Sequence, residues 1–511
     1  MRTVGIIAEY NPFHTGHEYH IKKAKEAAGA DYAIVVMSPD FVQRGEPAIF
    51  DKYTRTRMAL LGGADLVIEL PICYAAGSAE YFADGAVAML DSLGVVNALC
   101  FGGESDDVNL FQKTAEILLE EPEEYVQMLR EALKQGKTYP QARCEAMDKH
   151  IRFQTQGNET NAHKIKAADS LQKNSLSMPC FKPVNSADNI TSARKGSSDS
   201  AGSTASIARF LATPNNILGT EYCKALLKRG SQITPRPIKR QGSDYNSSSL
   251  NGTFCSATAI RNVITTCGGS KLTLSGVPEL RQEHTFSCSS LSSHESARIG
   301  FHKDAALWDQ VPSGYSVSHL YSDILLPYIP KRCKDLFLSA ASFALTPDDF
   351  LPYLNQKLLF MDTFSSILDI SSDLSDRIKS NRFKCIGKSY EEFVSELKTR
   401  QITEARIRRA LLHLILDIQT EAVTDFRENG TVFYARVLGF RRSASPLLHE
   451  IKRQTQIPFV VKNSAAEKEL SETAWKMWRQ DFYAAHLYRS ILSSKHDIAF
   501  RTEYECSPVI L

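Results

Sequence analysis

Two histidines near the start of the chain have the spacing to act together on one phosphoryl group. His14 and His17 are separated by Thr15 and Gly16. Side chains three residues apart lie on one face of a helical turn, so both imidazoles can reach the same ligand. Gly16 has no Cβ atom, which lets a bulky ligand approach the backbone. Two imidazole donors suit a phosphoryl group that gains negative charge in its transition state.

The segments on either side of these histidines predict a strand followed by a helix. Residues 3–8 are apolar and partly β-branched, which is typical of a buried strand. Residues 18–28 are rich in Ala, Lys, Glu and Ile, which predicts a helix. The first turn of a helix has unpaired N–H groups and a partial positive charge, so it favours an anion. The alternative is a structural turn capped by a histidine. The predicted strand before the motif and helix after it favour a phosphate site over this alternative.

The first 150 residues alternate between strand-like and helix-like segments. Strands are predicted at 32–37, 65–70 and 95–101, and helices at 51–61 and 78–93 and from about 108, 124 and 139. This alternation predicts an α/β, Rossmann-like fold, a parallel sheet with helices on both faces. Ligands of such sheets bind beyond the carboxyl ends of the strands. His14, His17 and Gly102 all fall at such ends.

A polar loop follows the second predicted strand. It carries Asp40, Gln43 and Arg44, and Lys52 comes soon after. Gln, Arg and Lys side chains can bind phosphates or a small carboxylate. The alternative is an exposed polar loop with no ligand.

Composition changes twice along the chain and suggests where domains end. The 511 residues are enough for two or three domains. Residues 151–204 are rich in Ser, Asn and Lys, which predicts a mostly disordered insertion. Residues 266–298 are rich in Ser and predict a linker. We therefore expect a nucleotide-binding domain over 1–265 and a mainly α-helical domain over 299–511.

The overall composition is that of a soluble globular protein, with 43% hydrophobic and 23% charged residues and a net charge of +2. Such a charge excludes a strong global field for nucleic acid, so any basic surface must be local. The 11 cysteines include no Cys-x-x-Cys pair, which disfavours a disulfide framework or a zinc ribbon. The apolar N-terminal run stops at Glu9 and no apolar run is long enough to span a membrane. We expect a cytoplasmic protein.

Basic residues gather in the C-terminal part. Between 398 and 409 there is one acidic residue and five basic ones, Lys398, Arg400, Arg406, Arg408 and Arg409. A second cluster combines basic and aromatic residues: Arg436, Arg441, Arg442, Lys452 and Arg453 with Phe433, Tyr434 and Phe440. Cations neutralise phosphates and aromatic rings stack on unpaired bases, so these clusters predict RNA binding. The alternative is a solvated helix face with ordinary core aromatics, and Trp475 and Trp478 are interpreted as core.

The opening motif, AEYNPFHTGH at 8–17, resembles the tRNA(Met) cytidine acetate ligase family, part of the wider group of HxGH nucleotidylyltransferase-like enzymes. The similarity continues through FVQRGEPA at 41–48, DLVIELP at 65–71, PNNILG at 214–219, IKR at 238–240 and SATAIR at 256–261. It reaches the C-terminal half at 398–409 and at YARVLGF, 434–440. It therefore covers most of the chain outside the two Ser-rich stretches. The long opening motif is the most specific of these.

The resemblance implies an ATP-dependent ligase that forms acetyl-adenylate from acetate and acetylates N4 of the wobble cytidine of elongator tRNA(Met). His14 and His17 would be catalytic, stabilising the α-phosphate. The implied ATP-binding residues are Ile7, Ala8, Glu9, Tyr10, Asn11, Pro12, Phe13, His14, Thr15, Gly16, His17, Glu18, Tyr19, His20, Gly102, Asn215 and Arg240. The tRNA-binding residues would be the five cations at 398–409. Mg²⁺ is the implied companion of ATP, and no metal-binding residue of the protein itself is predicted.

Two other functions stay open on the sequence. A small-molecule nucleotidylyltransferase would explain residues 1–265 but leave the C-terminal region without a role. The other is a non-catalytic RNA-binding protein that binds nucleotide as a ligand and does not turn it over. It would explain the N-terminal nucleotide motif and the C-terminal basic residues.

Overall fold

A mainly parallel sheet forms the centre of the computed structural model, which describes residues 1–138, 141–153, 210–211, 213–240, 255–267, 324–384 and 386–511. The order of its described strands is β10-β8-β5-β2-β1-β6-β7, with β9 paired to β8. They are β1 (Thr3–Ala8), β2 (Tyr32–Met37), β5 (Leu66–Glu69), β6 (Ala98–Gly103), β7 (Thr234–Lys239), β8 (Ala435–Phe440), β9 (Phe459–Val460) and β10 (Val509–Ile510). Short strands β3 (Phe41–Val42) and β4 (Glu46–Pro47) pair separately. The predicted α/β, Rossmann-like class is confirmed.

The strand order reverses at β1, which places a crevice beside its carboxyl end. β1 pairs in parallel with β2 on one side and with β6 on the other. Ligands of open α/β sheets bind in such a crevice, outside the carboxyl ends of the strands. Ile6 of β1 is in register with Cys100 of β6, so the two strands end side by side. The histidine motif after β1 and Gly102 at the end of β6 therefore lie at this switch point.

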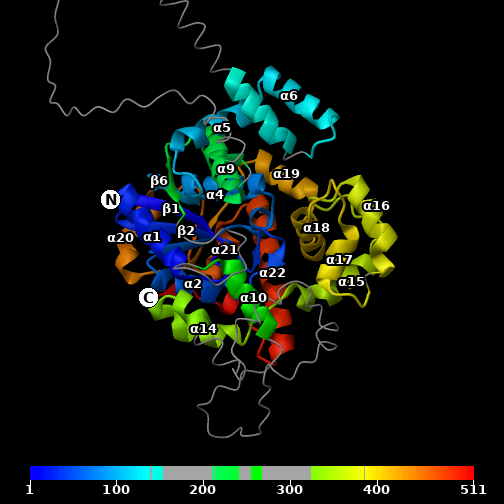
Figure 1. The fold of residues 1–511 in the computed structure, drawn as a ribbon. Helices are drawn as coiled ribbons and strands as arrows, with labels where there is room; N and C mark the ends of the chain where they lie inside the picture. The colour runs from blue at the N-terminus through cyan, green and yellow to red at the C-terminus, as the bar shows by residue number, and fades with distance from the viewer. Residues whose placement is uncertain (139–140, 154–209, 212, 241–254, 268–323, 385) are drawn as a thin grey trace, which may run out of the picture. The chain divides into compact units, whose positions relative to one another are not determined.

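Helices cover both faces of the sheet (Figure 1). Helices α1 (Thr15–Ala28), α2 (Lys52–Leu61), α10 (Ala257–Cys267) and α14 (Lys334–Ala341) share one hydrophobic cluster with Val4 and Ile6 of β1. Successive side chains of a strand point to opposite faces, and Gly5 faces α4 (Ala79–Ser92), where a Cβ atom would lie 2.7 Å from Leu90. The predicted helices of this part are confirmed, although α1 begins at Thr15 rather than at Glu18.

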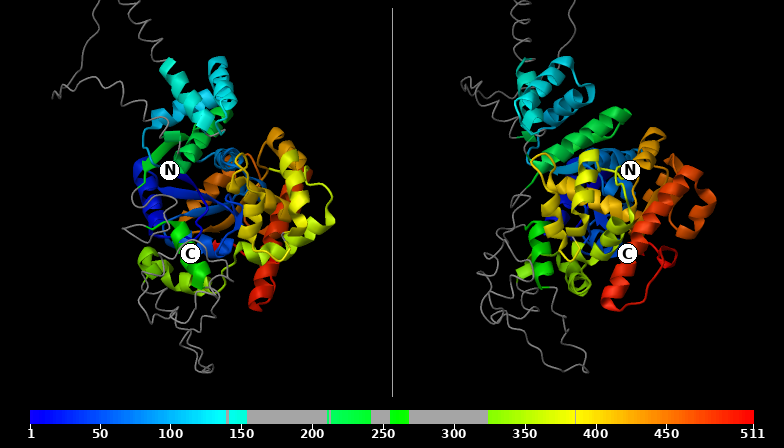
Figure 2. Two further views of the ribbon diagram at one scale, coloured as in Figure 1. Left: turned by 45° about the vertical axis from the view of Figure 1, so that its right-hand side comes forward. Right: turned by 90° about the vertical axis from the view of Figure 1, so that its right-hand side faces the viewer.

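The described C-terminal residues are mainly helical, as predicted. After α14 come α15 (Leu351–Phe360), α16 (Ser372–Asn381), α17 (Tyr390–Leu397), α18 (Glu404–Leu416), α19 (Thr420–Glu428), α20 (Ser445–Gln454), α21 (Asn463–Glu469) and α22 (Glu472–His496). Short 3₁₀ helices are η3 (Leu326–Tyr328), η4 (Lys331–Cys333), η5 (Pro347–Phe350), η6 (Arg382–Lys384), η7 (Arg442–Ala444) and η8 (Glu503–Glu505). The two views of Figure 2 show α22, in red, beside the yellow helices. Among the helices of the described ranges, none has the length and apolar character needed to cross a membrane.

Three C-terminal strands, β8, β9 and β10, complete the central sheet, which the sequence analysis missed. Strand β8 runs antiparallel to β5, with Leu66 opposite Phe440 and Ile68 opposite Val437. Tyr434 and Arg436 are fully buried. Their interpretation as part of an exposed RNA-binding cluster is therefore wrong, because both side chains are bound inside the protein, Tyr434 to Asp481 and Arg436 to Glu69 and Glu503.

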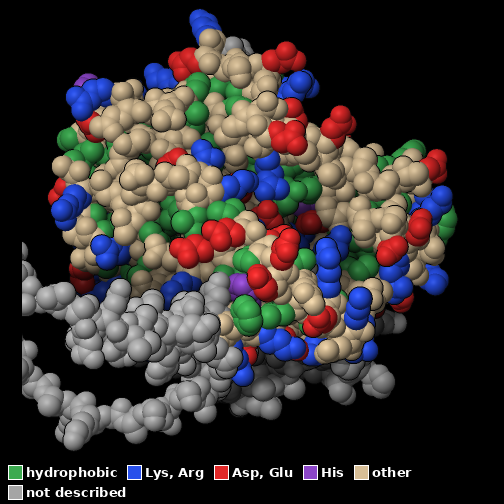
Figure 3. Space-filling model, turned by 90° about the horizontal axis from the view of Figure 1, so that it is seen from above, with side chains coloured by type: hydrophobic (Ala, Val, Ile, Leu, Met, Phe, Trp, Pro, Cys, Tyr) green, Lys and Arg blue, Asp and Glu red, His purple; other side chains and the backbone are tan. Residues whose placement is uncertain are grey.

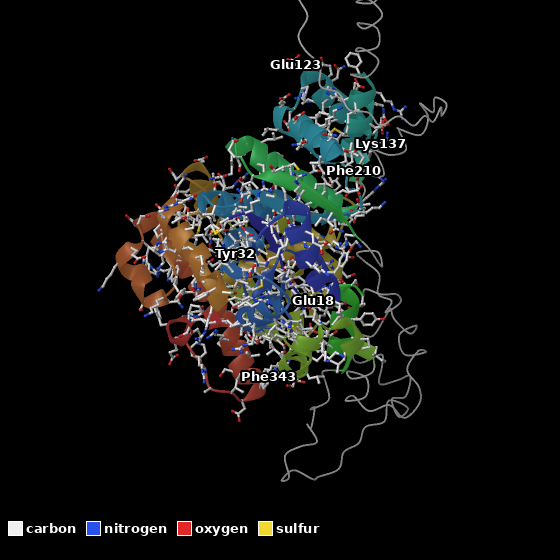
Figure 4. The ribbon with its side chains drawn as sticks, turned by 90° about the vertical axis from the view of Figure 1, so that its left-hand side faces the viewer. Glu18, Tyr32, Glu123, Lys137, Phe210 and Phe343 are labelled. Atoms are coloured by element: carbon white, nitrogen blue, oxygen red, sulfur yellow. The ribbon has the colours of Figure 1, made fainter. Side chains whose placement is uncertain are left out.

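Residues 113–217 form a second compact unit, separate from the unit of residues 1–112 and 218–511. Its described part contains most of α5 (Val108–Glu120), α6 (Glu123–Lys134), a helix over 141–153 and the start of α9 (Pro214–Arg229). Figure 4 marks α6 by Glu123 at its start and Lys137 just beyond its end. The predicted insertion at 151–204 and linker at 266–298 lie almost entirely outside the described residues.

Candidate active site

His14 and His17 cap the first turn of α1 by exchanging hydrogen bonds with the backbone. His14 is the N-cap residue, and its Nδ1 accepts a hydrogen bond from the Gly16 N–H at 3.0 Å. Nδ1 of His17 accepts from the His14 N–H at 3.4 Å. The two rings stack with centroids 3.7 Å apart. A capping role, the alternative weighed on sequence, is thus real, and it orients both rings as well.

The capping bonds decide which ring nitrogen can serve a ligand. A neutral imidazole carries one proton, and a nitrogen that accepts a backbone hydrogen bond cannot hold it. Nδ1 is the acceptor in both rings, so the proton is on Nε2 in His14 and in His17. Each ring therefore presents an Nε2–H donor on the edge away from the backbone. Two such donors at a helix start suit a phosphate oxygen.

Burial and neighbouring cations keep the histidines of this site neutral at pH 7. Loss of hydration, and then the charges of Arg240 and Arg261, lower the pKa of His14 to about 3. Loss of hydration, then His14, Arg240 and His20, lower the pKa of His17 well below its ordinary value. Burial, then Arg240, lowers the pKa of His20 to about 4. The rings therefore act as hydrogen-bond donors, while the arginines supply the positive charge that an anion would meet.

Three polar atoms around the motif are buried and have no hydrogen-bond partner among the described residues. They are the hydroxyl oxygens of Tyr10 and Thr15 and Nε2 of His20. A buried polar atom left unpaired costs free energy, so an unpaired group in a native structure often points to a ligand. Tyr10 has a positive φ of 49° and its ring centroid lies 4.8 Å from that of His17. Within the described part of the chain these atoms have hydrogen-bonding capacity left for a ligand.

Gly102 and Arg240 lie together on the next two strands. Gly102 of β6 is in register with Ile238 of β7, and Arg240 directly follows that strand. The Arg240 N–H donates to the carbonyl of Gly103 at 2.9 Å. A Cβ atom at Gly102 would lie 3.3 Å from Cγ of Arg240. The missing side chain lets the stem of Arg240 pack close to the backbone of β6.

The start of α10 brings a second group of polar residues to the same motif. Arg261 donates from Nη1 to the carbonyl of Asn11 at 2.6 Å and from Nη2 to the hydroxyl of Thr258 at 3.3 Å. Arg44 donates to the same hydroxyl at 3.3 Å. The amide oxygen of Asn11 accepts from the N–H of Ile49 at 2.8 Å. Arg261 and Arg44 were outside the predicted ATP set, although the SATAIR motif and the polar loop had pointed to them.

Other predicted residues have structural roles. Phe13 is fully buried, and a Cβ atom at Gly62 would lie 2.2 Å from its ring. Lys52, considered for phosphate binding, is fully buried with Nζ 2.7 Å from Glu69 and 3.0 Å from Glu503. That interpretation is therefore wrong for Lys52, because its charge is matched inside the protein.

The remaining residues of the predicted ATP-binding set differ in burial. Ile7, Ala8, Glu9, Thr15, Gly16, His17, Glu18, Tyr19 and His20 are partly exposed, and Tyr10, Asn11, Pro12 and His14 are buried. Figure 4 shows Glu18 in the first turn of α1 and, apart from it, Tyr32 at the start of β2. Asn215 belongs to the smaller unit, in the first turn of α9.

Comparison with known proteins decides the family. A model of the HIGH Nucleotidyl Transferase family matches residues 1–502. The tRNA(Met) cytidine acetate ligase of Thermoanaerobacter sp. (strain X514) is 35% identical over 96% of this chain and 95% of its own length. The protein of that name from Clostridium kluyveri (strain ATCC 8527 / DSM 555 / NBRC 12016 / NCIMB 10680 / K1) is 35% identical over 100% of this chain and 99% of its own. The chain belongs to the tRNA(Met) cytidine acetate ligase family.

Solved structures of a family member have the same fold. Thermotoga maritima TmcAL in its apo form gives a TM-score of 0.75 at 26% identity, with all of both chains covered. The same protein bound with alpha-thio ATP gives a TM-score of 0.73 at 26% identity, again over all of both chains. The similarity of the whole chain, including the C-terminal helices, confirms the resemblance drawn from the opening motif.

The five basic residues of this chain that are predicted to bind tRNA differ in exposure and in their partners. Arg408 lies 3.2 Å from Glu46 and also pairs with Glu391, and Arg409 lies 3.0 Å from Asp369. Lys398, although exposed, lies 2.5 Å from Glu404. Nε of Arg406 donates a hydrogen bond to the Asp369 carbonyl at 3.3 Å. Arg400 is exposed. On the face shown in Figure 3, basic and acidic side chains are interspersed.

Helix α18 is held against the loop that follows β2. Gly45 has a positive φ of 78°, and a Cβ atom there would lie 2.3 Å from the backbone of Arg408 and of Arg409. The hydroxyl of Tyr390 donates to the Gly45 carbonyl at 3.4 Å and lies 3.3 Å from the Arg408 carbonyl. Two of the predicted RNA-binding cations therefore belong to a packed interface inside the larger unit.

The described residues hold no group of three or more His, Cys, Asp and Glu side chains that could bind a metal ion. Mg²⁺ commonly binds through substrate phosphates and few protein ligands. The Nε2–H groups of His14 and His17 and the guanidinium groups of Arg240 and Arg261 are hydrogen-bond donors and do not ligate a cation.

Proposed function

We propose that this chain uses ATP to activate acetate and transfers the acetyl group to N4 of the wobble cytidine of elongator tRNA(Met). The observation that supports this most directly is the pair of Nε2–H donors of His14 and His17, placed at the switch point of the sheet beside Arg240. Membership of the tRNA(Met) cytidine acetate ligase family names the reaction that these donors would serve.

In the first step an oxygen of acetate attacks the α-phosphorus of ATP, the bond to the β-phosphate oxygen breaks, and pyrophosphate leaves. Negative charge grows on the α-phosphate oxygens in the transition state. The neutral histidines donate hydrogen bonds to this charge, and Arg240 and Arg261 balance it. Donors held in place by capping bonds need no reorganisation during the reaction.

In the second step N4 of the cytidine attacks the carbonyl carbon of acetyl-adenylate. The bond from that carbon to the phosphate oxygen breaks, AMP leaves, and N4 gives up one proton. Within the larger unit, ATP is held by the segment from Ile7 to His20 together with Gly102 and Arg240. Mg²⁺ would enter on the phosphates of ATP.

The test is incubation of the protein with ATP, labelled acetate and unfractionated tRNA, followed by nucleoside analysis. The proposal expects label in N4-acetylcytidine and formation of AMP. Folded protein that puts no label into RNA would overturn it. ATP–pyrophosphate exchange with acetate, compared with phosphate esters, separates this function from a small-molecule nucleotidylyltransferase. ATP binding without turnover of any substrate would favour a non-catalytic RNA-binding protein.

A further inference from the structure

Two phenylalanine side chains among the C-terminal helices are largely exposed to solvent. Phe360, the last residue of α15, is 81% exposed, and Phe383 in η6 is 65% exposed. Leu359 and Ile386 beside them are also about half exposed, at 50% and 46%. Single exposed apolar residues need no explanation, whereas a group of them marks an interaction surface.

Arg382 joins the two backbone segments that carry these phenylalanines. Its Nη1 donates to the carbonyl of Met361, the residue after Phe360, at 2.9 Å. Its guanidinium lies 4.9 Å from the centroid of the Phe383 ring. The end of α15 and the end of α16 are thereby joined, and both helices lie in the yellow part of Figure 1 with α17. The segments that carry the two exposed rings are therefore joined to each other.

Exposed cations surround the rings. Residues 371–388 contain five basic and two acidic residues, and Lys379 and Lys384 are exposed. On its other side α16 is tied to the end of α17, because Arg377 donates to the carbonyls of Glu396 and Leu397, each at 2.7 Å. This places the loop with exposed Arg400 beside α16. The segment 371–388, which carries Phe383, has an excess of positive charge that favours a polyanion.

We propose that Phe360, Phe383, Lys379 and Lys384, here named the aromatic surface, bind unpaired nucleotides of the RNA substrate. Bases stack on exposed aromatic rings whatever their identity, and nearby cations neutralise the phosphates between them. An apolar protein partner would not require the cations that flank the rings. The proposal rests on the proposed function and identifies where its RNA substrate is held, away from the cations of α18 that pair internally.

The test compares Phe360→Ala/Phe383→Ala with Phe500→Ala, a control that removes a ring 46% exposed elsewhere in the same unit. Loss of stacking on two bases is expected to raise the KM for tRNA about thirtyfold or more. The dissociation constant for labelled unfractionated tRNA should rise in parallel. ATP–pyrophosphate exchange with acetate should stay at the wild-type rate, and Phe383→Tyr should keep most of the affinity. Phe500→Ala should change none of these values.

Different results separate this proposal from the proposed function. Wild-type protein that acetylates no RNA would overturn the function. Active wild-type protein whose double variant binds and acetylates tRNA unchanged would overturn the aromatic surface. A change only in the size of the particle in light scattering, with RNA affinity unchanged, would assign the surface to contact between proteins and also overturn it. The single variants, each at an exposed position, carry the test if the double variant does not fold.

Discussion

Nη1 of Arg436 lies 3.0 Å from a carboxylate oxygen of Glu69, and both side chains are buried. Glu69 is the last residue of β5, and Arg436 is in β8, more than 360 residues further along the chain. Arg436 also pairs with Glu503, and Glu69 and Glu503 both pair with Lys52. The pair joins the C-terminal part of the chain to the carboxyl edge of the sheet that carries the histidine motif.

Removing the arginine from this network should destabilise the whole larger unit. Arg436→Leu leaves two carboxylates buried with one cation fewer, which is expected to cost about 3–5 kcal/mol in the free energy of unfolding. Urea unfolding followed by circular dichroism measures this cost. Arg442→Leu, at an exposed position nearby in sequence, should change the stability by less than about 0.5 kcal/mol. Equal effects of the two variants would show that the buried network is not stabilising.

His14 can be tested for catalysis separately from capping. His14→Asn keeps a good N-cap residue but removes the Nε2–H donor, so ATP–pyrophosphate exchange should fall about 10²- to 10³-fold, as for loss of one oxyanion donor. His14→Ala removes both functions and should also cost about 1 kcal/mol of stability. Both variants should bind tRNA as the wild type does. Full exchange activity in His14→Asn would leave His14 with a capping role only.

The stability of the protein should fall as the solution is acidified below pH 6.5. The pKa of His20 is lowered to about 4 in the folded protein, against about 6.5 in the unfolded chain. Between these values the unfolded chain binds a proton that the native state does not, so stability is present above pH 6.5 and is lost as pH falls towards 4.

The same argument gives the expected effect of His20→Gln. Each unit of pH well inside this window costs about 1.4 kcal/mol for one such histidine. His20→Gln should therefore reduce the slope of the free energy of unfolding against pH by up to that amount between pH 6 and pH 4.5. Urea unfolding at several pH values measures both slopes, and coincident slopes would contradict a neutral His20 in the folded protein.

Gly102 should tolerate no larger residue without loss of ATP affinity. An added Cβ atom would lie 3.3 Å from Cγ of Arg240, so the arginine must shift and the space beside β6 is reduced. Gly102→Ala should raise the KM for ATP severalfold and Gly102→Val should raise it more, with the KM for tRNA unchanged. Unchanged ATP affinity in both variants would remove Gly102 from the nucleotide site.

Substitutions of Arg400 and Arg408 should change different properties: RNA binding for Arg400 and stability for Arg408. Arg400 is exposed, whereas Arg408 pairs with Glu46 and Glu391. Arg400→Gln is expected to weaken tRNA binding and to lower the salt dependence of the affinity by about one counterion, with no change in stability. Arg408→Gln should lower the free energy of unfolding. Binding measured from 50 to 200 mM salt and urea unfolding give the comparison, and a reversed pattern would reject it.

Local patterns in the sequence determined much of the N-terminal half. The apolar runs predicted β1 and β2 at their observed bounds, and Asp51 and Gly62 lie at the two ends of α2. His14 and His17 could be found because their chemistry depends on residues three apart, at a strand-to-helix junction that local propensity signals. The opening motif also identified the family.

The tertiary structure alone decided the settings that depend on residues far apart in sequence. A strand such as β8 pairs with β5 across hundreds of residues, so no local pattern shows that Arg436 is buried against Glu69 rather than exposed to RNA. The same holds for Lys52 and Arg408, whose acidic partners come from other segments. Charge is a property of a residue type, whereas its availability to a ligand is set by burial and by the neighbours that folding supplies.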